Sequence, residues 1–65
     1  MSTKISLKAA RVNANLTQEE AAKRLNISPA TLIKWETKPD RVQPRYQKAI
    51  SDVYKIPIDD IFFGV

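Results

Sequence analysis

Cysteine and histidine are both absent from this chain of 65 residues, and glycine occurs once. Without cysteine the chain has no disulfide and no thiolate-bound metal, and without histidine it lacks the commonest metal ligand and general base. No metal and no cofactor are therefore expected. The carboxylates show no acid–base pairing, so an enzyme is not expected either. A domain of this size must rely on an efficient apolar core, which short chains usually build from packed helices.

Long apolar runs are also missing. No stretch approaches the ~20 apolar residues that a membrane-spanning helix needs. The opening segment, MSTKISLKAARV, lacks the uninterrupted apolar core of a signal peptide. The absence of cysteine also fits a reducing compartment. We therefore expect a cytoplasmic protein without a membrane partner that forms a single domain over residues 1–65.

Positive charge is concentrated in the N-terminal part of the chain. Residues 1–48 hold ten lysines and arginines against four acids, a net charge of +6. Residues 49–65 hold one lysine against three aspartates, a net charge of −2. This asymmetry favours a basic face turned toward a polyanion, with the C-terminal end kept away from it. An ordinary solvated surface rich in lysine explains the charge equally well.

Helix start signals recur along the chain. Ser6 and Ser28 are suited to N-caps, Pro29 to a first helical position, and Thr17 with Glu20 to a capping box. A proline opens each of the last two helical segments. The sequence thus predicts an all-α fold, a compact bundle of five short helices over residues 7–14, 17–25, 28–37, 44–54 and 57–62.

The second and third predicted helices are joined by a very short corner. Counted from Gln18, apolar residues fall at positions four, eight, ten, fifteen and eighteen: Ala21, Leu25, Ile27, Leu32 and Trp35. Position five is the small Ala22, where closely crossing helices leave little room, and position nine is Asn26, a residue that tolerates positive φ. This spacing is typical of a helix-turn-helix, which presents its second helix to the DNA major groove. Trp35 is interpreted as a core residue because it shares a helix face with Leu32.

The segment from Leu16 to Glu36 resembles the Cro and phage-repressor, or XRE-type, family of helix-turn-helix DNA-binding domains. The resemblance extends from about Leu7 to Phe62 and implies a lambda-repressor-like fold. It also implies a sequence-selective regulator of transcription on double-stranded DNA, either Cro-like or a small phage or prophage repressor. Family members usually carry glycine where this chain has Asn15 and Asn26, so we expect asparagine to adopt the left-handed turn conformation here. They often carry glycine after the third helix too, and without it the path of residues 37–43 is not predicted.

The resemblance also implies which residues contact DNA. The positions that face the major groove are Pro29, Ala30, Thr31, Ile33 and Lys34. Among them Lys34 can donate to guanine, and the apolar side chains can contact thymine methyl groups. The positions that contact the phosphate backbone are Thr17, Gln18, Lys38, Arg41 and Arg45. Three of these assignments have simpler alternatives: Ile33 as a rim residue of the core, Gln18 as a solvated helix start, and the basic loop as solvated surface.

Two further assignments concern pairing and assembly. Arg11 and Glu36 match a family ion pair that links the first helix to the end of the third. The C-terminal segment IPIDDIFFGV holds more apolar residues than one short helix can bury. Ile61 and Phe62 are expected to close the core, and the surplus residues are expected to form a weak homodimer, which in this family often uses the C-terminal region: Ile58, Phe63 and Val65. A monomer with a frayed tail is the alternative.

A second class of function stays open beside DNA binding. A helix-turn-helix scaffold can also serve as a protein-binding module, such as an antitoxin that holds a partner. No small-molecule ligand is expected for either class.

Overall fold

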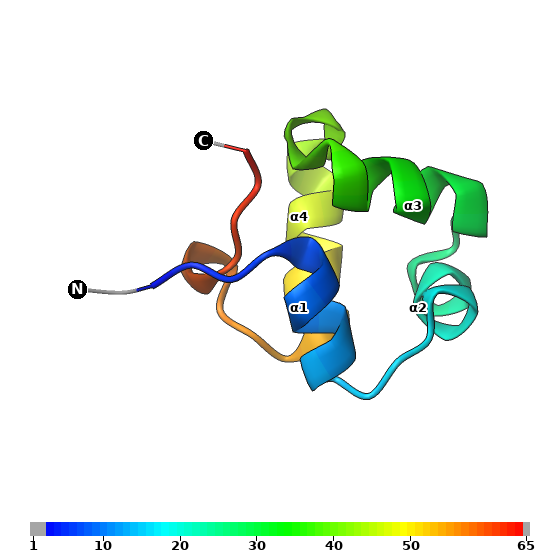
Figure 1. Ribbon diagram of the computed structural model, residues 1–65, viewed down its shortest axis with the longest axis horizontal. Helices are drawn as coiled ribbons and strands as arrows, with labels where there is room; N and C mark the ends of the chain where they lie inside the picture. The colour runs from blue at the N-terminus through cyan, green and yellow to red at the C-terminus, as the bar shows by residue number, and fades with distance from the viewer. Residues whose placement is uncertain (1–2, 65) are drawn as a thin grey trace.

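The computed structural model describes residues 3–64 as an all-α arrangement. Its elements are the α-helices α1 (Leu7–Asn13), α2 (Gln18–Leu25), α3 (Pro29–Thr37) and α4 (Pro44–Tyr54), and the 3-10 turns η1 (Pro39–Arg41) and η2 (Ile58–Asp60). The helices cross one another steeply, and both ends of the described chain lie on the side of α4 away from α2 (Figure 1). Within residues 3–64 no helix is both long and apolar enough to cross a membrane.

The predicted starts of the first four helices are confirmed. The Ser6 hydroxyl accepts the Ala9 amide at 3.0 Å, and Ser28 caps α3 in the same way. At α2, Thr17 and Glu20 form a complete capping box with distances of 3.0 and 3.1 Å. These short-range bonds satisfy amides that have no partner within the helix, so the helix starts follow from residues three apart.

Left-handed residues end two of the helical segments as predicted. Asn15 has φ of 60° and Asn26 has φ of 61°, the conformation in which family members use glycine. Lys55, after α4, has φ of 55° and was not anticipated, since lysine has no special tolerance for this region. The chain after α3 forms η1, which begins at Pro39.

The predicted fifth helix over residues 57–62 is wrong. Only the single turn η2 forms there, after which the chain becomes extended and makes a parallel bridge between Ile5 and Ile61. The Ile5 amide donates to Asp60 O at 2.9 Å, and the Phe62 amide donates to Ile5 O at 2.8 Å. Isoleucine and phenylalanine favour such extended backbone once a neighbouring segment offers hydrogen bonds.

The extended backbone also exchanges the roles predicted for the two phenylalanines. Successive side chains of an extended segment point to opposite sides. Ile61 and Phe63 are buried in the core, with Phe63 only 7% exposed, whereas Phe62 is 43% exposed. Phe63 is therefore not a surplus residue left over for a partner, and Phe62 does not close the core. Ile58 is exposed as expected, and Val65 lies outside the described residues.

One apolar core lies between the helices. Its buried members come from every α-helix, from the connections before α2 and α4, and from the C-terminal segment: Leu7, Ala10, Leu16, Ala21, Ala22, Leu25, Leu32, Trp35, Val42, Ile50, Tyr54, Ile61 and Phe63. Trp35 packs against Tyr46 with ring centroids 5.1 Å apart, which confirms its assignment to the core. Because Leu32 and Trp35 occupy the inner face of α3, the opposite face of that helix is left to solvent.

Candidate nucleic-acid interface

A tight corner sets the direction of α3. The Asn26 amide donates to Lys23 O at 3.1 Å and the Ile27 amide donates to Ala22 O at 2.9 Å, which ends α2 with a left-handed residue. Ala22 is fully buried at this crossing, where a larger side chain would push the helices apart. Ile27 packs against the core. Ser28 then starts α3, so the corner has the geometry of a helix-turn-helix.

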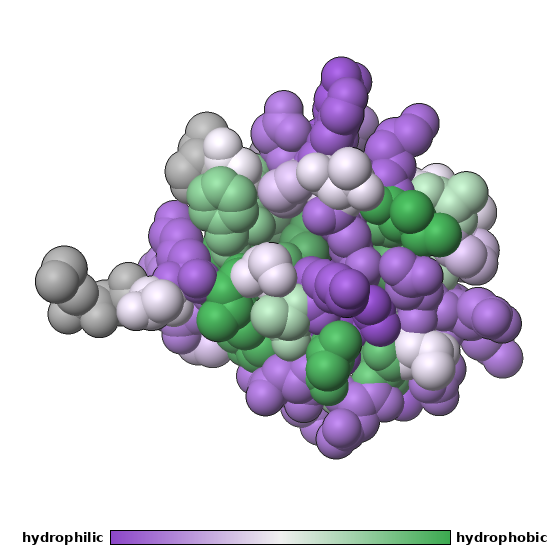
Figure 2. All heavy atoms as spheres, in the orientation of Figure 1, coloured by the Kyte–Doolittle hydropathy of each residue, from purple (hydrophilic) through white to green (hydrophobic). Residues whose placement is uncertain are grey.

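The outer face of α3 combines apolar and cationic side chains. Ala30, Ile33 and Lys34 are exposed along this face, and Ile33 keeps 47% of its surface exposed. Figure 2 shows apolar spheres over the position of α3, bordered by hydrophilic ones. Ile33 is thus exposed, and it is not among the apolar side chains that pack against the core.

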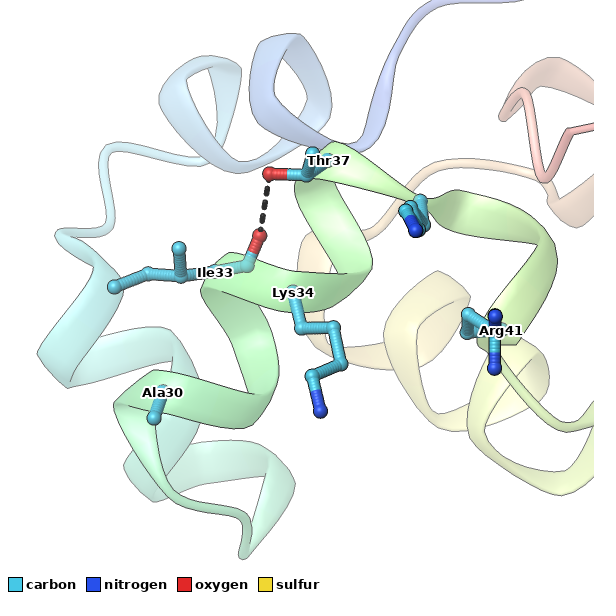
Figure 3. Close-up of a pocket in the computed structure, with 6 residues that line it drawn as sticks. Ala30, Ile33, Lys34, Thr37 and Arg41 are labelled. Carbon is cyan, nitrogen blue, oxygen red and sulfur yellow. Dashed lines mark hydrogen bonds between the residues drawn. The ribbon is translucent and has the colours of Figure 1, made fainter.

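A groove of about 460 Å³ lies between the outer face of α3 and η1. Its lining residues are Ala30, Ile33, Lys34, Thr37, Lys38 and Arg41. Figure 3 shows Ala30, Ile33 and Lys34 spaced along one side of α3, with Arg41 contributed by the following turn. The groove therefore brings together three predicted base-contacting residues and two predicted phosphate-contacting residues.

Thr37 is the groove residue that sequence reasoning missed. Its hydroxyl donates to Ile33 O at 3.1 Å, which keeps the side chain against its own helix (Figure 3). The signal was available, because Thr37 follows Ile33 by four residues and Lys34 by three, so it shares their helix face.

The other predicted contact residues lie outside this groove. Pro29 is exposed at the start of α3, and the Thr31 hydroxyl lies 2.9 Å from that of Ser28, which ties it to the helix cap. Thr17 is the N-cap of α2. Arg45 lies in the first turn of α4, where its guanidinium carbon lies 5.0 Å from the centre of the Tyr46 ring. This cation–π contact restricts an otherwise long and mobile side chain.

The predicted ion pair between Arg11 and Glu36 is present. Arg11 Nε donates to Glu36 Oε2 at 2.7 Å, and the two side chains are only 10% and 7% exposed. Arg11 Nη1 also donates to Leu16 O at 2.9 Å. The pair thus joins α1 to the last turn of α3 and also holds the loop before α2.

Gln18 takes part in the same network. Its Nε2 donates to Glu36 Oε1 at 3.1 Å, a contact that the sequence gave no means of predicting. The first residue of α2 is therefore linked by its side chain to α3. For a phosphate contact, Gln18 still has its backbone N–H and the second N–H of its side-chain amide.

Two ionisable groups near these elements have displaced pKa values. The backbone amide and hydroxyl of Thr17 lower the pKa of Glu20, with a smaller contribution from Arg24. Burial raises the pKa of Tyr54 to about 12, and the negative charge of Glu36 adds to the effect while Arg11 opposes it. The Tyr54 hydroxyl is buried and has no hydrogen-bond partner within residues 3–64.

Of the comparisons with known proteins, the one with protein families gives a match that agrees with this geometry. No curated protein and no solved structure matches the chain. Among protein families, the one described as helix-turn-helix matches residues 7–61, which cover α1 to α4 and the turn η2. The matched region contains the α2–α3 corner, the outer face of α3 and the Arg11–Glu36 pair. The chain therefore belongs to the XRE-type helix-turn-helix family of DNA-binding regulators.

Proposed function

We propose that this protein binds specific sequences of double-stranded DNA and regulates transcription in the manner of Cro proteins and small phage repressors. The observation that carries the proposal is the groove beside α3, in which exposed apolar side chains are followed by the cations Lys38 and Arg41. An α-helix fits the major groove of B-DNA, and cations beside it neutralise phosphates. In this arrangement α3 is the recognition helix.

The base contacts follow from the chemistry of that face. Lys34 is placed to donate to O6 or N7 of guanine, and Ile33 and Ala30 offer apolar surface to the C5-methyl group of thymine. Pro29 can add to the apolar contact at the start of α3. Thr31 has its hydroxyl engaged with Ser28, so its methyl group is the free part of the side chain.

The phosphate contacts come from the starts of two helices, α2 and α4, and from the turn after α3. Lys38 and Arg41 reach one strand from the groove wall, and Arg45 reaches the backbone or the minor groove from α4. Thr17 and Gln18 bring the amides at the start of α2, where the helix dipole favours an anion.

Selection of bound duplexes from a random pool, followed by salt titration, tests the proposal. With roughly four to six phosphate contacts per subunit, the logarithm of the binding constant should fall with the logarithm of salt at a slope of several negative units. A protein that binds no duplex at low salt, or binds with a flat salt response, contradicts DNA binding and favours the protein-binding alternative.

The apolar base contacts can be tested by removing a single methyl group from the DNA. Replacing a contacted thymine by uracil should weaken binding roughly fourfold, which corresponds to ~0.8 kcal/mol for one buried methyl group. Ile33→Ala should reduce this difference between thymine and uracil. Lys34→Ala is the matched control, since it should change the preferred base at another position and leave the methyl effect intact. An unchanged methyl effect in Ile33→Ala contradicts the assignment.

We also propose a weak two-fold dimer through the C-terminal end, which would place two recognition helices ~34–36 Å apart on DNA. The exposed side chains Ile58 and Phe62, which stand in a segment of negative charge, support this surface. Phe62→Asp should keep the fold and abolish cooperative filling of two half-sites. Cooperative binding by Phe62→Asp, or selected sites without two-fold symmetry, contradicts the dimer.

A further inference from the structure

Gly64, near the C-terminal end, lies directly against the turn that follows the recognition helix. A Cβ atom at this residue would lie 2.8 Å from Asp40 Cβ, 2.9 Å from Asp40 N and 3.1 Å from Asp40 Cα. Real Cβ atoms essentially never lie within 3.0 Å of another heavy atom, as two of these distances would require. Two of the three opposing atoms belong to the backbone and cannot turn aside. Gly64 also has φ of 90°, a conformation that side chains disfavour. Both the space and the backbone conformation therefore require glycine.

The contacted residue, Asp40, is the middle residue of η1. Its neighbours in the chain include Lys38 and Arg41, which line the groove beside α3. Within η1 the Arg41 amide donates to Lys38 O at 3.0 Å and the Val42 amide donates to Pro39 O at 3.2 Å. A single turn with such bonds has little intrinsic stability, so its orientation depends on what packs against it.

The segment that carries Gly64 is itself held in place. The bridge to Ile5 fixes the chain at Ile61 and Phe62, and the Phe63 side chain is buried in the core. Figure 1 shows this segment running from η2 to the side of the η1 turn. The contact of Gly64 with Asp40 therefore joins the C-terminal segment, which is held in place by these bonds, to η1, which has little stability of its own.

We propose that Gly64 is a positioning residue for DNA binding: its close contact with Asp40 holds η1 so that Lys38 and Arg41 remain on the wall of the groove. The consequence for DNA rests on the proposed function, whereas the mechanical link between tail and turn does not. A methyl group at Gly64 would displace η1 and move both cations away from the phosphates that the groove approaches.

The test compares the protein of 65 residues with its Gly64→Ala variant on a duplex that carries one half-site, so that dimer formation does not enter. The variant should bind ~3- to 10-fold more weakly and show a shallower salt dependence, because fewer phosphates are neutralised. Lys38→Ala and Arg41→Ala should each weaken binding less in the Gly64→Ala background than in the wild type. Val12→Ala, which alters an exposed apolar side chain of α1 away from the groove, should bind this duplex like the wild type.

A matched pair of second substitutions separates the contact from charge. In the Gly64→Ala background, Asp40→Gly removes the nearest opposing atom and should restore part of the affinity. Asp40→Ala removes the same charge but keeps the Cβ atom, so it should restore less. Equal gains from the two substitutions would show that charge, and not the contact, determines the effect.

Amide hydrogen exchange gives a readout that does not involve DNA. In Gly64→Ala, exchange at the Arg41 and Val42 amides should accelerate several-fold, while exchange within α2 stays as in the wild type. Unchanged exchange at these two amides overturns the inference whatever the DNA result. If exchange changes and the wild type binds no duplex, the proposed function fails and the link between tail and turn stands. If the wild type binds and Gly64→Ala binds identically, the positioning role fails and the proposed function stands.

Discussion

Glu36 is the residue whose removal should reveal most about how the recognition helix is held. Its carboxylate accepts hydrogen bonds from Arg11 and from Gln18, so it links α3 to both α1 and α2. Glu36→Ala leaves the Arg11 guanidinium buried with Leu16 O as its remaining acceptor, and leaves the Gln18 amide unpaired. Removing one partner of a buried ion pair lowers the free energy of unfolding by ~3–5 kcal/mol, because the remaining charge is uncompensated.

That loss is large for a chain of this size. At ~0.05–0.15 kcal/mol per residue, the whole domain is stable by roughly 3–10 kcal/mol. Glu36→Ala should therefore lower the melting temperature by more than ~12 °C, or leave the protein partly unfolded at 25 °C. Circular dichroism during heating and urea titration measures both the shift and the free energy of unfolding.

Two controls identify the source of the loss. Glu36→Gln keeps an oxygen acceptor without the charge, so it should cost less than Glu36→Ala. The double substitution Arg11→Met with Glu36→Leu removes both charges and fills the space with apolar groups. It should be more stable than Glu36→Ala, because no buried charge remains unpaired. A loss below ~1 kcal/mol in Glu36→Ala, or a double variant less stable than it, would refute the reasoning.

Three further outcomes are expected from single substitutions, each read by thermal or urea unfolding. Because Asn26 has φ of 61°, Asn26→Gly should be neutral or mildly stabilising, whereas Asn26→Val should lower the free energy of unfolding by ~1–2 kcal/mol. A valine variant as stable as the wild type contradicts the left-handed corner. Tyr54 has its pKa raised to about 12, so between pH ~10 and 12 the unfolded chain releases a proton that the folded chain keeps, and stability should fall as pH rises. Tyr54→Phe should lose less stability over this window, and an identical fall in both proteins contradicts the assignment. Phe63→Asp should unfold the domain or lower its melting temperature sharply, because it places an unpaired charge in the core. Phe62→Asp should melt like the wild type. If Phe62→Asp were the more destabilised of the two, the core assignment of Phe63 would be wrong.

The local features of this protein were readable from the sequence. The caps at Ser6, Thr17 and Ser28 and the left-handed residues Asn15 and Asn26 depend on partners within a few positions along the chain. The division of α3 into an inner face and an outer face follows from helical periodicity alone. The Arg11–Glu36 pair was anticipated through the family resemblance, because no spacing rule connects residues 25 positions apart.

The tertiary structure decided what depends on distant segments. The bridge between Ile5 and Ile61 replaced the expected last helix with extended chain, and this exchanged the buried and exposed phenylalanines because the side-chain period changed from 3.6 to 2. The bond from Gln18 to Glu36 and the contact of Gly64 with Asp40 likewise join residues that no local pattern relates. For a short segment at the end of a chain, the helical and extended conformations have similar free energies. Here the hydrogen bonds offered by Ile5 favour the extended conformation.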